Sequence, residues 1–122
     1  MRRHGSAAVG ALALALAAAC GSPTATPEDA ARVRRGRDVY VFEGCGNCHG
    51  ADRRGSRTAP TLEGVQRHWS AEELLRYLRA PRAYPADRRL RSLSARFRAE
   101  MAGLPAADQE RVRDLVAFLL SP

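Results

Sequence analysis

The chain has 122 residues, a formal net charge of +7, and aromatic side chains at only 6% of its positions. This length provides one small domain and a tail, which excludes a multidomain architecture. A domain of this size has a marginal hydrophobic core, so its stability needs a further contribution.

The first segment has the pattern of an export signal. Arg2 and Arg3 give it a charged start, and the apolar run over residues 7–19 is interrupted only by Gly10. Such a run is short for a membrane span and is typical of the apolar part of a secretory signal peptide. We therefore predict a signal peptide over residues 1–19 and export from the cytoplasm.

Two interpretations of the cleavage compete at Cys20. The sequence Ala17-Ala18-Ala19 is an A-x-A site, after which a soluble protein would keep a free cysteine. Residues 16–20 also resemble a bacterial lipobox, although Ala17 replaces the leucine more common there. We favour a lipid on Cys20, because a lone thiol at this point of an exported chain otherwise needs its own explanation. An uncleaved anchor is the third alternative.

A tether over residues 20–27 leads to the folded part of the chain. Its proline, threonine and alanine content predicts a flexible, partly extended segment. One domain is expected over residues 28–122, and its first helix over residues 28–42, where acidic side chains suit the first turn. Gly36 lies within this helix, where glycine costs about 1 kcal/mol relative to alanine. It is either tolerated there or marks a close helix contact.

The centre of the chain is the motif Cys45-Gly46-Asn47-Cys48-His49. This C-x-x-C-H pattern indicates a c-type haem attachment site. Each thiol adds across one vinyl group of the porphyrin, and the imidazole that follows is carried beneath the iron as a ligand. We therefore predict one covalently bound haem, which would supply much of the stability that the small core lacks.

Other uses of the motif explain less of it. A zinc ribbon needs a second ligand pair at metal-ligand spacing, and the only other cysteine is Cys20. A redox dithiol would sit near a β-α-β pattern, and the sequence has no strong strand run. A structural disulfide between Cys45 and Cys48 would leave His49 unexplained.

A loop and a second helix follow the motif. Residues 51–64 contain Gly55, Pro60 and Gly64, which predict an irregular connection. Ser70 and Glu73 are spaced as a capping box, and the helix that they begin is expected to end near Ala80, where a proline follows.

Two further helices are expected in the last third of the chain. A short one would place Leu90, Leu93 and Phe97 on one face. The last helix is expected over residues 106–120, because its apolar side chains recur at helical spacing. These side chains are Val112, Leu115, Val116 and Leu119.

Gly36 and Tyr40, placed ahead of the motif at residues 45–50, resemble the opening of class I c-type cytochromes of the bacterial monohaem kind. The resemblance covers about residues 30–120. It implies an all-α domain wrapped around one covalently bound haem. It also implies that the first and last helices cross at Gly36, and that Tyr40 packs against Phe118.

The resemblance assigns residues on the proximal side of the haem. The segment Ala59-Pro60-Thr61-Leu62 is similar to the family's Gly-Pro-Asn-Leu, with departures at Ala59 and Thr61. It implies that the carbonyl of Pro60 accepts a hydrogen bond from the ring N–H of His49, which fixes the ring and raises its donor strength. Leu62 would pack on the haem face. An ordinary proline turn is the alternative.

The resemblance also assigns Trp69 and Met101. The indole N–H of Trp69 would hydrogen-bond a haem propionate, although a core tryptophan with a wet edge explains the residue as well. Met101 would be the distal ligand, a soft thioether that fills the sixth coordination site of the iron. Small molecules would then be excluded, and the iron would only exchange electrons. Ala102 replaces the proline that often follows. Ligation by His68, an open site, and Met101 as a core gap-filler are the alternatives.

These expectations describe a one-electron carrier, not an enzyme, on the periplasmic side of a bacterial membrane. Its partners would be redox proteins and, through the lipid on Cys20, the membrane, with no nucleic acid. Five arginines form a positive collar for an acidic partner or a plain solvated surface. They are Arg88, Arg89, Arg91, Arg96 and Arg98. Two alternatives are a haem-based ligand sensor or small peroxidase with an open distal site, and a cytochrome subunit of a larger oxidase or dehydrogenase complex.

Overall fold

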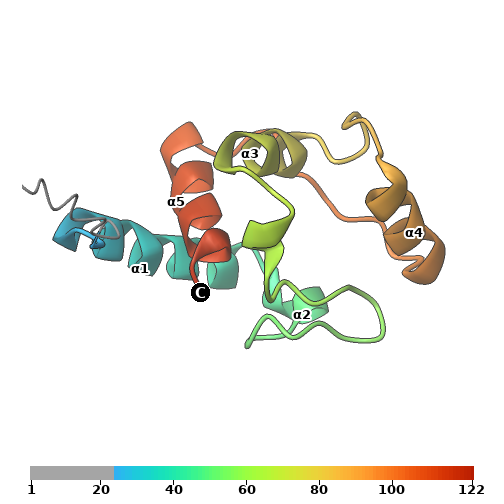
Figure 1. Cartoon of the computed structure of the whole chain (residues 1–122), viewed down its shortest axis with the longest axis horizontal. Coiled ribbons are helices and arrows are strands. Elements are labelled where there is room, and N and C mark those ends of the chain that lie inside the picture. Colours follow the sequence, from blue (N-terminus) through green and yellow to red (C-terminus); the bar gives the residue numbers. More distant parts are fainter. Residues whose placement is uncertain (1–23) are drawn as a thin grey trace, which may run out of the picture.

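The computed structural model describes residues 24–122, so the predicted signal peptide and Cys20 lie outside the described residues. This part of the chain is helical and contains no strand, which confirms the all-α fold class (Figure 1). No helix within residues 24–122 is long and apolar enough to cross a membrane. The elements are α1 (Pro27–Phe42), α2 (Gly46–His49), the 3-10 turn η1 (Val65–Arg67), α3 (Ala71–Arg79), α4 (Arg88–Arg96) and α5 (Gln109–Leu120).

Helix α1 begins at Pro27, one residue before the expected start, because Thr26 caps it. The Thr26 hydroxyl accepts the Asp29 N–H at 3.1 Å, and the Asp29 carboxylate accepts the Thr26 N–H at 2.9 Å. This capping box satisfies two amide groups at the helix start, and proline suits the first helical position. Thr26 and Pro27, which the sequence placed in the tether, therefore belong to the helix start.

Helix α3 has the predicted capping box. The Ser70 hydroxyl accepts the Glu73 N–H at 3.3 Å, and the Glu73 carboxylate accepts the Ser70 N–H at 3.0 Å. The helix then presents Leu74 and Leu78 to the protein interior, where both are buried. The expected helix is therefore present, and it ends one residue before Ala80.

Helix α4 is the short helix that the apolar spacing predicted. Asp87 caps it by accepting the Leu90 N–H at 2.7 Å. Leu90 is buried and Leu93 half-buried, whereas Phe97 lies one residue beyond the helix end. In Figure 1, α4 stands at the end of the molecule opposite the start of α1.

Helix α5 begins at Gln109, so the expected start at residue 106 was wrong. Asp108 caps the helix, because its carboxylate accepts the N–H groups of Glu110 at 2.9 Å and Arg111 at 3.3 Å. An aspartate in this position stabilises a helix start and places the preceding residues outside it.

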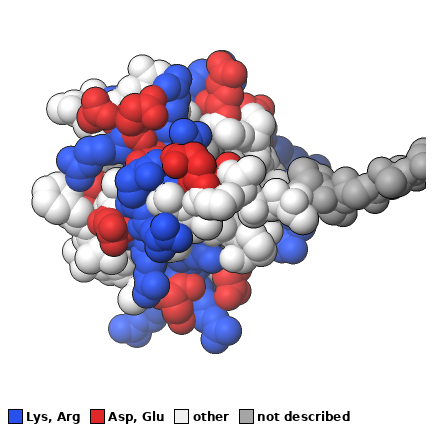
Figure 2. Space-filling view, turned by 90° about the vertical axis from the view of Figure 1, so that its left-hand side faces the viewer, with Lys and Arg blue, Asp and Glu red and all other residues white. Residues whose placement is uncertain are grey.

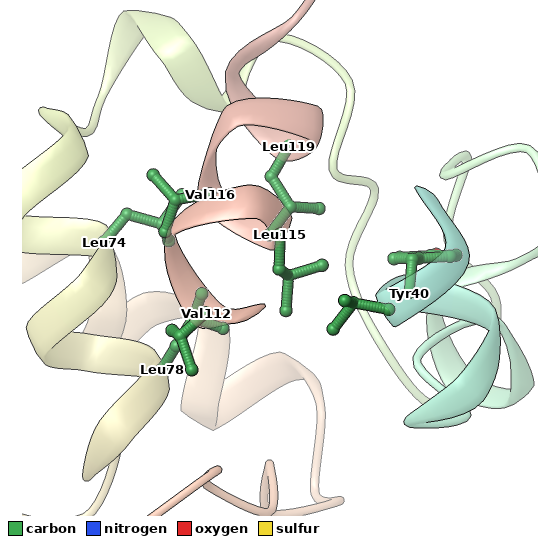
Figure 3. Close-up of a cluster of buried hydrophobic side chains, with 8 residues drawn as sticks. Tyr40, Leu74, Leu78, Val112, Leu115, Val116 and Leu119 are labelled. Carbon is green, nitrogen blue, oxygen red and sulfur yellow. The ribbon is translucent and has the colours of Figure 1, made fainter. Parts of the chain in front are cut away.

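The hydrophobic core is built around α5, which packs against α1 and α3 (Figure 1). Val112 and Val116 lie beside Leu74 and Leu78 of α3 (Figure 3). Leu115 has no exposed surface. The last helix therefore joins the first helix to the middle of the chain, and it fixes the frame that holds the motif.

The crossing of α1 and α5 is as close as Gly36 implied. A Cβ atom at Gly36 would lie 2.6 Å from the carbonyl carbon of Asp114 and 2.7 Å from the Cβ of Phe118. One turn later, the rings of Tyr40 and Phe118 meet edge to face, with their centroids 5.4 Å apart. Only glycine leaves room for the two backbones to approach this closely.

An ion pair closes the same crossing. The carboxylate of Asp114 is buried, and Arg35 of α1 donates its Nε–H to it at 2.9 Å. The Nε of Arg32 lies 3.6 Å from the other carboxylate oxygen. A buried carboxylate that loses its partner is strongly destabilising, so the arginines on this face of α1 have a structural role.

Candidate haem-binding site

The C-x-x-C-H motif forms the short helix α2, directly after α1. The backbone is left-handed at the glycines on its two sides, Gly44 (φ 71°) and Gly50 (φ 81°), which lets the chain turn sharply into and out of the motif. Cys45 precedes the helix and Cys48 lies three positions later, so the helical turn places both thiols on one side. Both are free thiols, Cys45 half-buried and Cys48 exposed. Burial raises the pKa of the Cys45 thiol above its usual value.

His49 ends α2 and has one ring nitrogen fixed. Its Nδ1 lies 2.8 Å from the carbonyl oxygen of Pro60. A carbonyl only accepts hydrogen bonds, so Nδ1 carries the proton and the lone pair of Nε2 is left to bind a metal. The hydrogen bond that the family resemblance implied is therefore present.

The loop between His49 and the proline is held by its own hydrogen bonds. Ser56 donates its hydroxyl to the carbonyl of Cys48 at 2.7 Å and its N–H to the carbonyl of Ala59 at 2.9 Å. The Gly55 N–H donates to the carbonyl of His49 at 2.7 Å. The sequence identified Ser56 only as a loop residue, because its partners come from the folded turn and leave no local pattern.

Tyr40 supports the motif from the core side. Its hydroxyl donates to the carbonyl of Gly50 at 2.6 Å, and its ring packs against Phe118. Burial raises the pKa of Tyr40 to about 12, so the phenol keeps its proton and remains a donor. The end of α2 is thereby tied to the helix crossing.

The Tyr40→Phe variant should lose this tie and cost about 1 kcal/mol of stability, or up to about 3 if the Gly50 carbonyl stays buried without a donor. The wild-type protein should also become less stable between about pH 10 and about pH 12. In that window the unfolded chain has released the phenolic proton, whereas the folded protein still holds it. Denaturant unfolding below and within this window measures both effects. A variant that loses stability with pH as steeply as the wild type would contradict the assignment.

The arrangement fits a c-type haem. The two thiols are available for thioether bonds on one side of a helical turn. In the His49 imidazole, which follows directly, Nδ1 is bonded to Pro60 and Nε2 is left to bind the iron. The family model of cytochrome c matches residues 33–122. The chain belongs to the cytochrome c family. It is a class I c-type cytochrome, and its cofactor is covalently attached haem c with iron.

Membership of the family makes the protein a haem-based electron carrier with redox protein partners. No curated protein and no solved structure gives a significant match to the chain. The details of the cytochrome's haem surroundings therefore come from its own residues.

Trp69 lies in an aromatic cluster that the sequence did not predict. Its ring centroid is 5.0 Å from that of Tyr77 and 5.5 Å from that of Tyr84. The guanidinium of Arg89 lies over the indole, 4.8 Å from its centroid. Trp69 is half-buried and also packs against the core. One arginine of the predicted collar is thus part of a stack. The only signal for the cluster in the sequence was a pair of tyrosines, Tyr77 within α3 and Tyr84 after its end.

Leu62 and Met101 come from distant parts of the cytochrome and pack against the same core. Both side chains are partly buried there. Met101 lies in the connection between α4 and α5, and His68 is exposed at the end of η1. Of the two side chains considered as the distal ligand, Met101 is therefore partly buried and His68 is exposed.

The connection that carries Met101 is fixed to α3 immediately afterwards. The Leu104 N–H donates to the carbonyl of Leu78 at 2.8 Å. The guanidinium of Arg79 donates to the carbonyls of Ala107 at 2.5 Å and Pro105 at 3.2 Å. The sequence did not predict a role for Arg79. Its contacts hold the connection in one path, although the connection itself is not helical.

Proposed function

We propose that the cytochrome holds its haem through Cys45, Cys48, His49 and Met101. It would carry single electrons in an electron-transfer chain outside the cytoplasm. The observation that carries this proposal is the hydrogen bond from His49 Nδ1 to the Pro60 carbonyl at 2.8 Å. It orients the ring and presents Nε2 beside two free thiols. When bound, haem iron supplies the one-electron chemistry, and the residues orient it and shield it from water.

Met101 would act as the second axial ligand. It is the only methionine besides Met1, it is partly buried, and it lies in a connection anchored to α3. A thioether raises the reduction potential relative to a second imidazole, and an occupied sixth position excludes small molecules. Leu62 and Trp69 would line the haem, with the indole N–H directed to a propionate.

Purified cytochrome should accept one electron per chain, and carbon monoxide should leave the spectrum of its reduced form unchanged. Visible spectroscopy during a reductive titration, with and without carbon monoxide, measures both. Rapid binding of carbon monoxide by the wild-type protein would favour a ligand sensor or small peroxidase over a carrier. Stable co-purification with a larger enzyme would favour a cytochrome subunit of an oxidase or dehydrogenase.

Export and lipidation at Cys20 complete the proposal, and the signal pattern in residues 1–20 supports them. The segment from Cys20 to the start of α1 spans at most roughly 25 Å when extended, so the haem domain would work close to the membrane surface. Cys20→Ala should move the protein from the membrane fraction to the soluble fraction without loss of haem. Unchanged partitioning would favour a retained apolar anchor.

The arginines around α4 would steer an acidic redox partner. Arg88, Arg91, Arg96 and Arg98 are exposed, and this stretch leads directly to Met101. If Met101 binds the iron, the stretch borders the distal side, where electrons would enter or leave. By contrast, on the side where α1 begins, arginines and acidic residues are interspersed (Figure 2).

Reversing Arg96 and Arg98 to glutamate should slow electron transfer with an acidic redox protein, and the wild-type rate should fall as salt rises. Both effects follow from electrostatic steering, which is screened beyond about 8 Å at physiological ionic strength. Stopped-flow measurement over a range of salt concentrations tests this.

The matched control reverses Arg34 and Arg37, two exposed arginines of α1. Arg32 is unsuitable, because a glutamate there would face the buried carboxylate of Asp114. Equal losses in the two double variants, or a wild-type rate that is independent of salt, would leave the α4 arginines as ordinary surface charge.

A further inference from the structure

Arg53 has a backbone conformation that needs an explanation. Its φ is 65°, and it is the only non-glycine residue within residues 24–122 with a left-handed backbone. A residue with a Cβ atom is sterically strained in this region. Such a residue persists when its surroundings hold it there, so the contacts of Arg53 show what the strain maintains.

The side chain of Arg53 closes the carboxyl end of α5. Its guanidinium donates to the carbonyls of Phe118 at 2.9 Å and Ser121 at 3.3 Å, and it lies 4.8 Å from the centroid of the Phe118 ring. The last carbonyls of a helix have no partner within the helix, and a positive charge there complements the helix dipole. Arg53 thus joins the loop after the haem motif to the last helix.

The backbone of Arg53 holds the other side of the same loop. Its carbonyl accepts the N–H of Leu62 at 2.7 Å and the hydroxyl of Thr61 at 3.2 Å. These residues directly follow Pro60, whose carbonyl accepts the hydrogen bond from His49. One residue therefore links the end of α5 to the segment that orients the imidazole.

The two parts of this loop lie too close together to shift independently. A Cβ atom at Gly55 would be 2.6 Å from the Thr61 nitrogen and 2.8 Å from the Pro60 carbonyl carbon. Because the loop is packed this tightly, a displacement of Arg53 is transmitted to the Pro60 carbonyl.

We infer that Arg53 is a positioning residue for the haem: by clamping the loop to the end of α5, it holds the Pro60 carbonyl against His49 and thereby sets the reduction potential. The inference rests on the proposed ligation by His49 and goes beyond it. A firm hydrogen bond to Nδ1–H makes the imidazole a stronger donor, which favours ferric iron and lowers the potential. Loosening the clamp should raise the potential.

The experiment compares Arg53→Asn with Arg54→Asn in the haem-loaded cytochrome. Asparagine tolerates the left-handed backbone, so the first variant removes the guanidinium contacts with little change in strain. Arg54 is the matched control, because it is the exposed neighbour and pairs with the surface groups Glu63 and Asp52. Both variants lose one positive charge, which by itself favours ferric iron and lowers the potential.

Loss of the positive charge lowers the potential, whereas loss of the clamp raises it. Arg54→Asn should lower the potential slightly, whereas Arg53→Asn should give a potential above that of the control. In nuclear magnetic resonance spectra, the His49 Nδ1–H should exchange with solvent about tenfold faster in Arg53→Asn only, the factor that corresponds to one net hydrogen bond. The same spectra of the wild type test the ligation, since the ring protons of an iron-bound histidine are displaced by the paramagnetic ferric ion.

Equal potentials and equal exchange rates in the two variants would overturn the inference and leave Arg53 as a helix cap, whatever its effect on stability. Wild-type His49 signals without a paramagnetic shift would overturn the proposed ligation itself. If Arg53→Asn fails to fold, Arg53→Lys serves in its place. Lysine keeps the charge but has no planar fork of donors, so its potential should rise above that of the wild type, and an unchanged potential would refute the clamp.

Discussion

Gly36→Ala should destabilise the cytochrome by about 3 kcal/mol or more, the upper part of the range for overpacked contacts. The added methyl group would lie 2.6 Å from the carbonyl carbon of Asp114 and 2.7 Å from the Cβ of Phe118. The first is a backbone atom of α5 and the second is bonded directly to the α5 backbone. Neither can move without separating the two helices. The separation would also weaken the packing of Tyr40 on Phe118 and the ion pair of Asp114 with Arg35.

Gly46→Ala is the matched control for this prediction. A Cβ at Gly46 would meet Tyr40 Cε1 at 3.5 Å and Ala51 at 3.6 Å, which are ordinary contacts. Helix propensity alone would make either substitution stabilising by up to about 1 kcal/mol. Denaturant unfolding of the haem-loaded proteins should therefore give effects of clearly different size at the two glycines. A stabilising effect at Gly36 would mean that α1 and α5 do not cross there in solution.

The sequence located the helices whose start signals are local. Ser70 and Glu73 gave the start of α3 correctly, because a capping box needs only residues three positions apart. It misplaced the start of α5 at residue 106, since Leu104 bonds to the carbonyl of Leu78 in α3 and Asp108 caps the helix later. The first of these contacts is tertiary, and the sequence pattern does not contain it.

The residues of the candidate site also differ in whether a local sequence pattern predicted them. Cys45, Cys48 and His49 were evident from their spacing, because covalent attachment requires adjacent thiols and a nearby imidazole. The partner of His49, at Pro60, followed only from the family resemblance. Arg53 was not predicted at all, because the partners of its guanidinium lie 65 or more residues away and its left-handed backbone has no sequence signature.

Met101→Ala should open the iron of the cytochrome to external ligands. If Met101 is the distal ligand, its loss leaves a position that carbon monoxide can occupy in the reduced protein and cyanide in the oxidised protein. The potential should fall, because the thioether that favours ferrous iron is gone. Visible spectra with each ligand and a redox titration measure the two effects.

Leu104→Ala provides the control that separates ligation from packing. Leu104 lies three residues further along the same connection and, like Met101, packs partly buried against the core. Its truncation should also reduce stability, by an amount below the about 2–5 kcal/mol typical of fully buried sites. It removes no donor atom, so the iron should stay closed to carbon monoxide and cyanide.

The comparison distinguishes the remaining possibilities for the distal side. Ligand binding in Met101→Ala but not in Leu104→Ala would identify the thioether as the axial donor. Equal ligand binding in both variants would mean that loosening the connection is enough to expose the iron. A Met101→Ala variant with unchanged potential and no ligand binding would rule Met101 out and direct attention to His68. His68 is exposed at the end of the turn before Trp69. His68→Ala in the Met101→Ala background would then be the variant that opens the site.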